Sequence, residues 1–140
     1  MDSRSYYSRS FENPLILHIA HRSDWVSALA RGSYTTPSLT TEGFIHCSTI
    51  AQLTNTANRH FRGQKGLVVL CIDESRLRAS LKYEPPMPAL NEEQNPDTLF
   101  PHLYGPLNPD AVVRVIDLPC SADGTFEMPA ALAKLRDDAS

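Results

Sequence analysis

The chain lacks both a long apolar run and an excess of positive charge. Its longest apolar run covers residues 67–72, far short of the ~20 residues that a membrane-spanning helix needs. Lys and Arg total 13 against 16 Asp and Glu, and the formal net charge is −3. Non-specific nucleic-acid binding usually requires a basic patch. We therefore expect neither membrane insertion nor non-specific nucleic-acid binding, while a small anionic ligand stays compatible with this balance.

Cysteine is scarce, with three residues and no C-x-x-C pair. An odd number without paired spacing is typical of reduced thiols rather than of a disulfide framework. Cys47 and Cys71 lie in apolar strand-like runs, so we expect both in the core. Residues 1–13 lack the apolar segment of a secretion signal. The sequence thus predicts a cytoplasmic protein with a disordered leader over 1–13 and a single globular domain over 14–140.

Hydrophobic periodicity predicts more strands than helices, without regular alternation between them. Strands are expected at 15–20, 43–47, 67–73, 81–84, around His102, at 111–118 and in a short segment ending at Met128. Helices are expected at 23–31, 50–61 and 130–136, with loops at 35–42 and 85–98. In the first helix, Trp25 and Leu29 should share a face, and Thr49 with Gln52 should form a capping box before the second. This order favours the α+β class.

Three of the five histidines lie in separate strand-like segments. Alternate residues of a strand share a face, so Phe44, His46 and Ser48 point one way and Ile45 and Cys47 the other. By the same rule, His102 shares a face with Phe100 and Tyr104, and His18 lies mid-strand. The histidines are too far apart for a local motif, so the fold would have to assemble them. We expect one cleft lined by these histidines.

Within that cleft we assign His46, His102 and Ser48 as candidate catalytic residues, since neutral histidine exchanges protons near neutral pH. A helix begins after Ser48, and helix N-termini bind anions. The candidate substrate-binding residues are His18, Thr49, Tyr104, Arg59 and Glu84. No two of the three histidines are close in sequence, so we expect no metal site. The structural alternatives stay open: a core histidine for His18, a helix cap for Ser48 and Thr49, and a solvated helix face for Arg59.

Several segments resemble a family known as domain of unknown function 952. They are LHIA (17–20), Trp25, SL (38–39), EGFIHCST (42–49), ANR (57–59), GQ (63–64) and FPHLYGPL (100–107). The resemblance covers about residues 15–118. This family is similar in layout to the ADP-ribosyltransferase superfold, which implies a single domain with a split, twisted mixed sheet and two to three short helices.

The resemblance also implies roles for individual residues. His18 matches the ribose-binding histidine of the first strand, and His46 with Ser48 matches the second strand. His102 falls where that superfold has a glutamate, which puts ordinary transfer to protein side chains in doubt. Glu84 is the best substitute for the missing carboxylate.

Three functions follow from these roles, and the sequence does not decide between them. The first is an enzyme or binder for a nucleotide-like or phosphorylated small molecule, with NAD as a candidate cofactor. The second is a lyase, isomerase or cyclase that acts on an organic metabolite without NAD. The third is a non-catalytic ligand-binding or interaction module. The sequence predicts a small-molecule ligand as partner and gives no oligomeric state.

Overall fold

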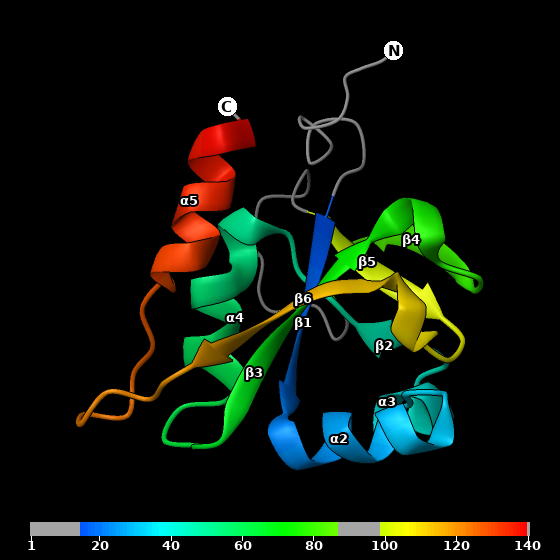
Figure 1. Ribbon diagram of the computed structural model, residues 1–140, viewed down its shortest axis with the longest axis horizontal. Helices are drawn as coiled ribbons and strands as arrows, with labels where there is room; N and C mark the ends of the chain where they lie inside the picture. Colours follow the sequence, from blue (N-terminus) through cyan, green and yellow to red (C-terminus); the bar gives the residue numbers. More distant parts are fainter. Residues whose placement is uncertain (1–14, 87–98, 140) are drawn as a thin grey trace.

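Two antiparallel sheets form the framework of the molecule (Figure 1). The computed structural model describes residues 15–86 and 99–139. The first sheet has the order β1-β3-β6, built from Leu15–His21, Leu67–Asp73 and Val112–Leu118. The second has the order β2-β5-β4, built from Ile45–His46, Phe100–Tyr104 and Ser80–Glu84. Together with the helices they make a single α+β domain, as the sequence predicted.

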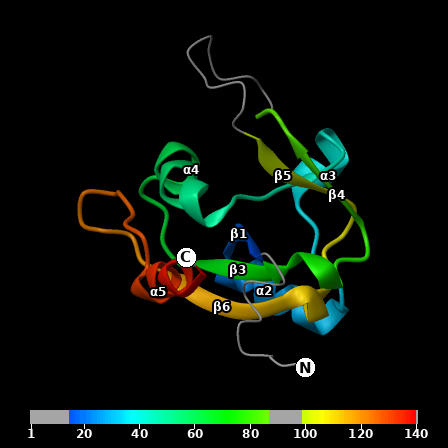
Figure 2. The same cartoon turned by 90° about the horizontal axis from the view of Figure 1, so that it is seen from above.

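Short helices lie in several of the connections between these strands, and one more follows the last strand. The α-helices are α2 (Arg22–Arg31), α3 (Pro37–Thr41), α4 (Leu53–His60) and α5 (Ala130–Ala139). Single turns of 3₁₀-helix occur at η1 (Ile50–Gln52), η2 (Glu74–Arg76) and η3 (Pro109–Ala111). The second sheet lies on one side of the first, and α4 and α5 lie on the other (Figures 1 and 2).

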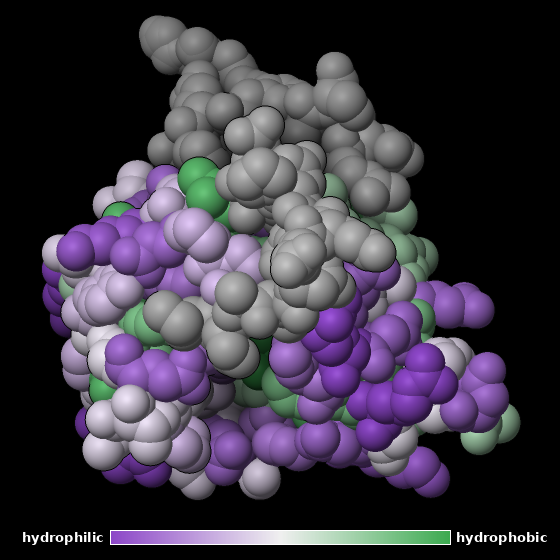
Figure 3. All heavy atoms as spheres, turned by 180° about the vertical axis from the view of Figure 1, so that it is seen from behind, coloured by the Kyte–Doolittle hydropathy of each residue, from purple (hydrophilic) through white to green (hydrophobic). Residues whose placement is uncertain are grey.

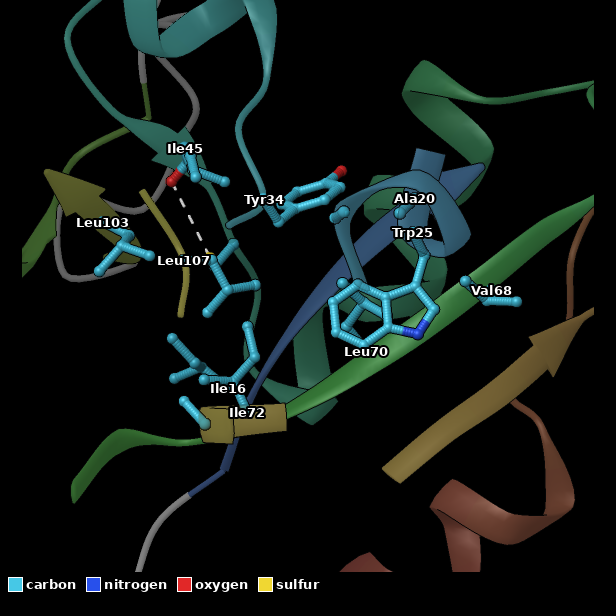
Figure 4. Packing of buried hydrophobic residues seen from close by; sticks show 13 residues of the cluster. Ile16, Ala20, Trp25, Tyr34, Ile45, Val68, Leu70, Ile72, Leu103 and Leu107 are labelled. Atoms are coloured by element: carbon cyan, nitrogen blue, oxygen red, sulfur yellow. Dashed lines mark hydrogen bonds between the residues drawn. The ribbon is translucent and has the colours of Figure 1, made fainter. Parts of the chain in front are cut away.

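The first sheet is covered on both faces, which explains why all seven residues of β3 are buried. On one face, Leu70 and its neighbours pack with Trp25 of α2 and Ile45 of β2 (Figure 4). On the other face, Val69 and its neighbours pack with Leu53 of α4 and Leu132 of α5. Cys47 belongs to the first cluster and Cys71 to the second, and both are buried, as predicted.

A backbone bridge near the middle of β1 connects the first sheet to the segment that follows β2. Leu17 and Ser48 exchange two backbone hydrogen bonds, each 2.7 Å long. Because Ser48 lies two residues after the end of β2, this bridge fixes where the second sheet meets the first. The histidines at positions 18 and 46 flank it.

Several predicted elements are confirmed by the structure. The strands at 15–20, 67–73 and 81–84 occur nearly where expected, with β3 central. The capping box of Thr49 and Gln52 is present, and the Thr49 amide donates to Gln52 Oε1 at 2.9 Å. The leader at 1–13 and most of the 85–98 loop lie outside the described residues.

Three other expectations about the elements are wrong. Residues 35–42 contain α3, because Pro37 begins a short helix as its first residue. Every strand pair in the two sheets is antiparallel, so neither sheet is mixed. The described residues hold four α-helices where two to three were expected, since α3 adds one. Trp25 and Leu29 lie one turn apart on α2, as expected; Trp25 is buried with Ala28, whereas Leu29 is 54% exposed.

The predicted strand ending at Met128 is also wrong. The residues before Met128 form no strand. The Asn58 side chain holds this segment in place of a strand partner: its amide nitrogen donates to the Phe126 carbonyl at 3.1 Å, and its oxygen accepts from the Phe126 amide at 2.8 Å.

Hydrophilic residues cover much of the face seen from behind, with only scattered apolar residues among them (Figure 3). Within residues 15–86 and 99–139, no helix has the length and apolar character required to cross a bilayer.

Candidate functional site

A row of three polar side chains crosses the second sheet. His46 of β2 pairs with His102 of β5, which in turn pairs with Lys82 of β4. Residues directly opposite each other on neighbouring strands point to the same face. The imidazole rings of His46 and His102 consequently meet, with their centroids 5.6 Å apart and their planes 73° to each other.

The alternation of apolar and polar residues places this row on one face. One position along each strand, Ile45 pairs with Leu103 and Leu103 with Leu81. These three side chains pack into the core between the sheets. A shift of register by one residue would turn the histidines towards the core between the sheets and these aliphatic side chains away from it. The hydrophobic core therefore determines that the histidines share the opposite face.

Glu84 links His102 and Tyr104. Its Oε1 lies 2.7 Å from His102 Nδ1 and accepts a hydrogen bond from the Tyr104 hydroxyl at 2.6 Å. The hydrogen bond from Tyr104, followed by that from His102, holds the pKa of the Glu84 carboxyl below its usual value. The same bond raises the pKa of Tyr104. Glu84 is therefore ionised near neutral pH, and Tyr104 stays a neutral donor.

His46 has a carboxylate partner of its own. Its Nε2 lies 3.0 Å from Glu42 Oε1. The His46 side chain is 44% exposed and that of His102 is 2% exposed. The site thus contains two carboxylate-paired histidines, one open to solvent and one buried.

Phe44 packs against both histidines. Its ring stacks on His102 with centroids 4.0 Å apart and an interplanar angle of 18°, and it lies 4.8 Å from the His46 ring. Tyr104 contacts the same phenyl ring at 5.3 Å. The shared face of Phe44 and His46 was predicted from alternation, but the contact of Phe44 with β5 was not. This packing limits the movement of both imidazoles.

His18 lies beneath this face with both ring nitrogens bonded. Its Nδ1 lies 2.6 Å from the His46 carbonyl oxygen, and its Nε2 lies 2.8 Å from the Tyr34 hydroxyl. A carbonyl oxygen only accepts, so Nδ1 carries the proton and Nε2 accepts from Tyr34. Burial lowers the pKa of His18 to about 4, although the bond to the His46 carbonyl acts in the opposite direction. His18 is consequently neutral and joins β1 to the backbone of β2.

The hydroxyl groups of Ser48 and Thr49 bond within the fold. Ser48 is buried, and its hydroxyl donates to Thr56 of α4 at 3.3 Å. The Thr49 side chain accepts from the backbone amide of Gln52 in the capping box. An anion at this helix start would therefore compete with an existing cap.

Arg59 lies exposed in the last turn of α4, outside the hydrogen-bonded groups around the histidines. Three further residues of the site were not predicted from sequence: Glu42, Tyr34 and Lys82. Glu42 precedes His46 by four positions, and Lys82 lies two positions before Glu84, on the same face of β4. The local sequence therefore contained a pattern that could have identified both residues. Tyr34 had none, because its contact with His18 spans 16 residues of chain.

The chemical capacity of the site is proton exchange and hydrogen bonding. The two imidazoles and the Lys82 amine can donate, the two carboxylates orient the imidazoles, and the single hydroxyl hydrogen of Tyr104 is already donated to Glu84. Lys82 Nζ lies 4.9 Å from the centre of the Tyr104 ring. Across residues 15–86 and 99–139, no three or more His, Cys, Asp or Glu side chains are grouped so as to hold a metal ion. The expectation of a metal-free site stays a prediction.

Comparisons with known proteins identify relatives of known structure. The family model described as "Protein of unknown function (DUF952)" matches residues 19–115. The crystal structure of protein CC0527 from Caulobacter crescentus is 36% identical with a TM-score of 0.72, over 85% of this chain and 98% of that one. The crystal structure of a double mutant of CC0527 is 35% identical with a TM-score of 0.72, over 85% of this chain and 98% of that one. The solution NMR structure of CC0527 is 36% identical with a TM-score of 0.69, over 86% of this chain and 97% of that one. No curated protein matches the chain.

Proposed function

The chain belongs to the DUF952 family, and we propose that it binds and transforms a small phosphorylated or nucleotide-like molecule at the face that carries His46 and His102. One observation carries the proposal: two histidines, each paired with a carboxylate, face each other with ring centroids 5.6 Å apart. Paired acid and base groups at such a separation suit proton transfer to and from one bound molecule. Phosphate oxygens are the acceptors that imidazolium and Lys82 would recognise.

The candidate catalytic residues are His46, His102 and Ser48, in the order of support. His46 is open to solvent, and His102 is held by Glu84 and Phe44. Ser48 is less favoured because its buried hydroxyl already donates to Thr56. Among the proposed ligand-binding groups, Tyr104 and Glu84 lie directly beside His102. His18, Thr49 and Arg59 would contribute from the surrounding shell.

NAD is the candidate cofactor or substrate, from the similarity of the family to the ADP-ribosyltransferase superfold. Glu84 supports this analogy, because it brings a carboxylate next to His102, where that superfold has its glutamate. Such a molecule would be met in the cytoplasm, the location that the reduced and buried Cys47 and Cys71 favour. The analogy is one of layout and carries less weight than the histidine geometry.

The second candidate function is a lyase, isomerase or cyclase acting on an organic metabolite without NAD. The carboxylate–histidine pairs favour it, since proton transfer alone suffices for such reactions. A non-catalytic ligand-binding module would use the same face without turnover. Binding of NAD distinguishes the first candidate from the second, and turnover distinguishes both from the third.

A thermal-shift screen tests the proposal with NAD, ADP-ribose, nucleoside phosphates and inorganic phosphate. A ligand that binds the folded state at 100 times its Kd stabilises the protein by about 2.7 kcal/mol. We expect at least one of these ligands to raise the Tm of the wild-type protein and of the His21→Gln variant, but not of His46→Gln. His21 is an exposed histidine at the end of β1 and serves as the matched control. An equal Tm shift in His46→Gln, or no shift with any ligand, would contradict the proposal.

A further inference from the structure

We infer that Glu84 is a positioning residue that holds His102 with its proton on Nδ1 and leaves Nε2 as the proton acceptor of the site. This inference deepens the proposed function and rests on it only for the bound molecule. In the ADP-ribosyltransferase analogy, the carboxylate would bond the ribose directly. The hydrogen bonds of Glu84 assign it a different task, which is to act on the ligand through His102.

The tautomer of His102 follows from the chemistry of its partners. Glu84 Oε1 accepts the Tyr104 hydroxyl at 2.6 Å and lies 2.7 Å from His102 Nδ1. An ionised carboxylate has no proton to donate. The hydrogen on the 2.7 Å contact therefore belongs to Nδ1, and Nε2 carries the free lone pair.

Two neighbours hold the Glu84–His102 pair in the geometry that this task requires: Tyr104 bonds Glu84, and Phe44 packs on His102. The Tyr104 hydroxyl donates to the same Glu84 oxygen that accepts the hydrogen bond from His102 Nδ1, so the carboxylate cannot turn without losing both bonds. Phe44 stacks on the other side of the His102 ring at 4.0 Å. With its Nδ1 anchored and its ring face covered, His102 keeps a fixed orientation.

The charged and titratable groups around His102 come from three strands. Glu84 and Lys82 face it from β4, His46 from β2, and Tyr104 lies beside it on β5. When Nε2 takes a proton from a bound molecule, the ring becomes an imidazolium, and the Glu84 carboxylate stabilises that charge. The proton moves from the ligand to Nε2 without any transfer of electrons. His46, which is open to solvent, is placed to return a proton to the ligand.

The test is nitrogen-15 NMR of the histidine rings, because the chemical shifts of the two ring nitrogens report which one carries the proton. The probe is the isotope-labelled protein itself at alkaline pH, and His102→Gln identifies the His102 signals. We expect the Nδ1–H form for His102 in the wild-type protein. Glu84→Ala should lose that signature, because Nδ1 then lacks its acceptor.

Glu42→Ala is the matched control, since it removes the carboxylate of His46 and leaves that of His102. It should leave the His102 signature unchanged. An Nε2–H form in the wild-type protein, or a His102 signature that survives Glu84→Ala, would overturn the inference. The wild-type spectrum decides even if Glu84→Ala does not fold. Since no ligand is needed, failure of this inference is distinguishable from failure of the proposed function.

Discussion

At the scale of single residues, His18 differs from the other two histidines of the site. Both of its ring nitrogens are bonded inside the protein, to the His46 carbonyl and to the Tyr34 hydroxyl. Protonation would force Nε2 to give up its bond from Tyr34 and would place a charge in a buried position. His18 therefore positions His46 by holding its backbone, and its neutral state is part of the folded structure.

This neutral state predicts a pH dependence of stability. Burial lowers the pKa of His18 from 6.5 to about 4. Because the pKa of His18 is lower in the folded protein, the unfolded chain takes up the proton at a higher pH than the folded protein does. The contribution of neutral His18 to the free energy of unfolding is therefore fully present above pH 6.5 and is lost as the pH decreases towards 4. The slope is up to about 1.4 kcal/mol per pH unit for one proton. Urea unfolding at a series of pH values measures it.

The control for this pH dependence is a second histidine. His21→Gln should keep the slope, since His21 is exposed, whereas His18→Gln should flatten it between pH 6.5 and 5. The lowered pKa of Glu84 acts in a different window, because that stabilisation is lost only as the pH falls below the usual carboxyl value of 4.5. A slope that persists in His18→Gln would show that another group is responsible.

At the scale of elements, a turn after β5 depends on a close approach of two chain segments. A Cβ atom at Gly105 would lie 2.7 Å from the Cβ of Ala79, inside any normal contact distance. Neither carbon can rotate away, so the backbone would have to shift. Because β5 carries His102 and Tyr104, this contact also bears on the site.

We therefore expect Gly105→Ala to destabilise the protein by roughly 1–3 kcal/mol, the usual cost of overpacking. The double variant Gly105→Ala with Ala79→Gly should recover part of this loss, because it removes the opposing carbon. Chemical denaturation of the two single variants and the double variant measures the coupling. Strict additivity of the two changes would show that the steric argument is wrong.

Local patterns in the sequence predicted the elements with strong periodicity and their faces. Continuous apolar character identified β3, and alternation placed His46 and His102 with their side chains opposite Ile45 and Leu103. Weak signals failed where side chains replaced backbone pairing: the sequence predicts a strand at Phe126, whereas the Asn58 side-chain amide holds this segment.

Contacts between strands that are far apart in the chain could not be predicted from the sequence. His102 meets Glu84 across 18 residues and His18 meets His46 across 28, and only the register of the sheets determines such partners. The alternation of polar and apolar residues along a strand predicts which face of the sheet a side chain occupies. It does not predict which residue of the next strand lies beside it. The candidate residues could accordingly be selected from sequence, whereas their pairing into two carboxylate–histidine units could not.

At the scale of the whole molecule, the histidine face lies on the side of the second sheet opposite the core that the two sheets share. The Leu17–Ser48 bridge and the bond from His18 to the His46 carbonyl connect them. The core between the sheets adds Leu70 of β3 and Leu103 of β5 to the same cluster. Since the sheets share this core, separating them would expose apolar surface on both. The second sheet should therefore unfold together with the first.

Native-state hydrogen exchange tests this cooperativity. The Ser48 amide donates to the Leu17 carbonyl at 2.7 Å, and we expect it to exchange with the same opening free energy as the Leu70 amide in the centre of β3, the free energy of global unfolding. The Thr125 amide, which donates only to an exposed Asp123 side chain, should exchange at a much lower opening free energy and serves as the internal control. If the Ser48 amide instead opened at an energy near that of Thr125, the second sheet would be a separate, weaker unit. The histidine face would then be assembled only part of the time, and ligand affinity would decrease in proportion to the closed fraction.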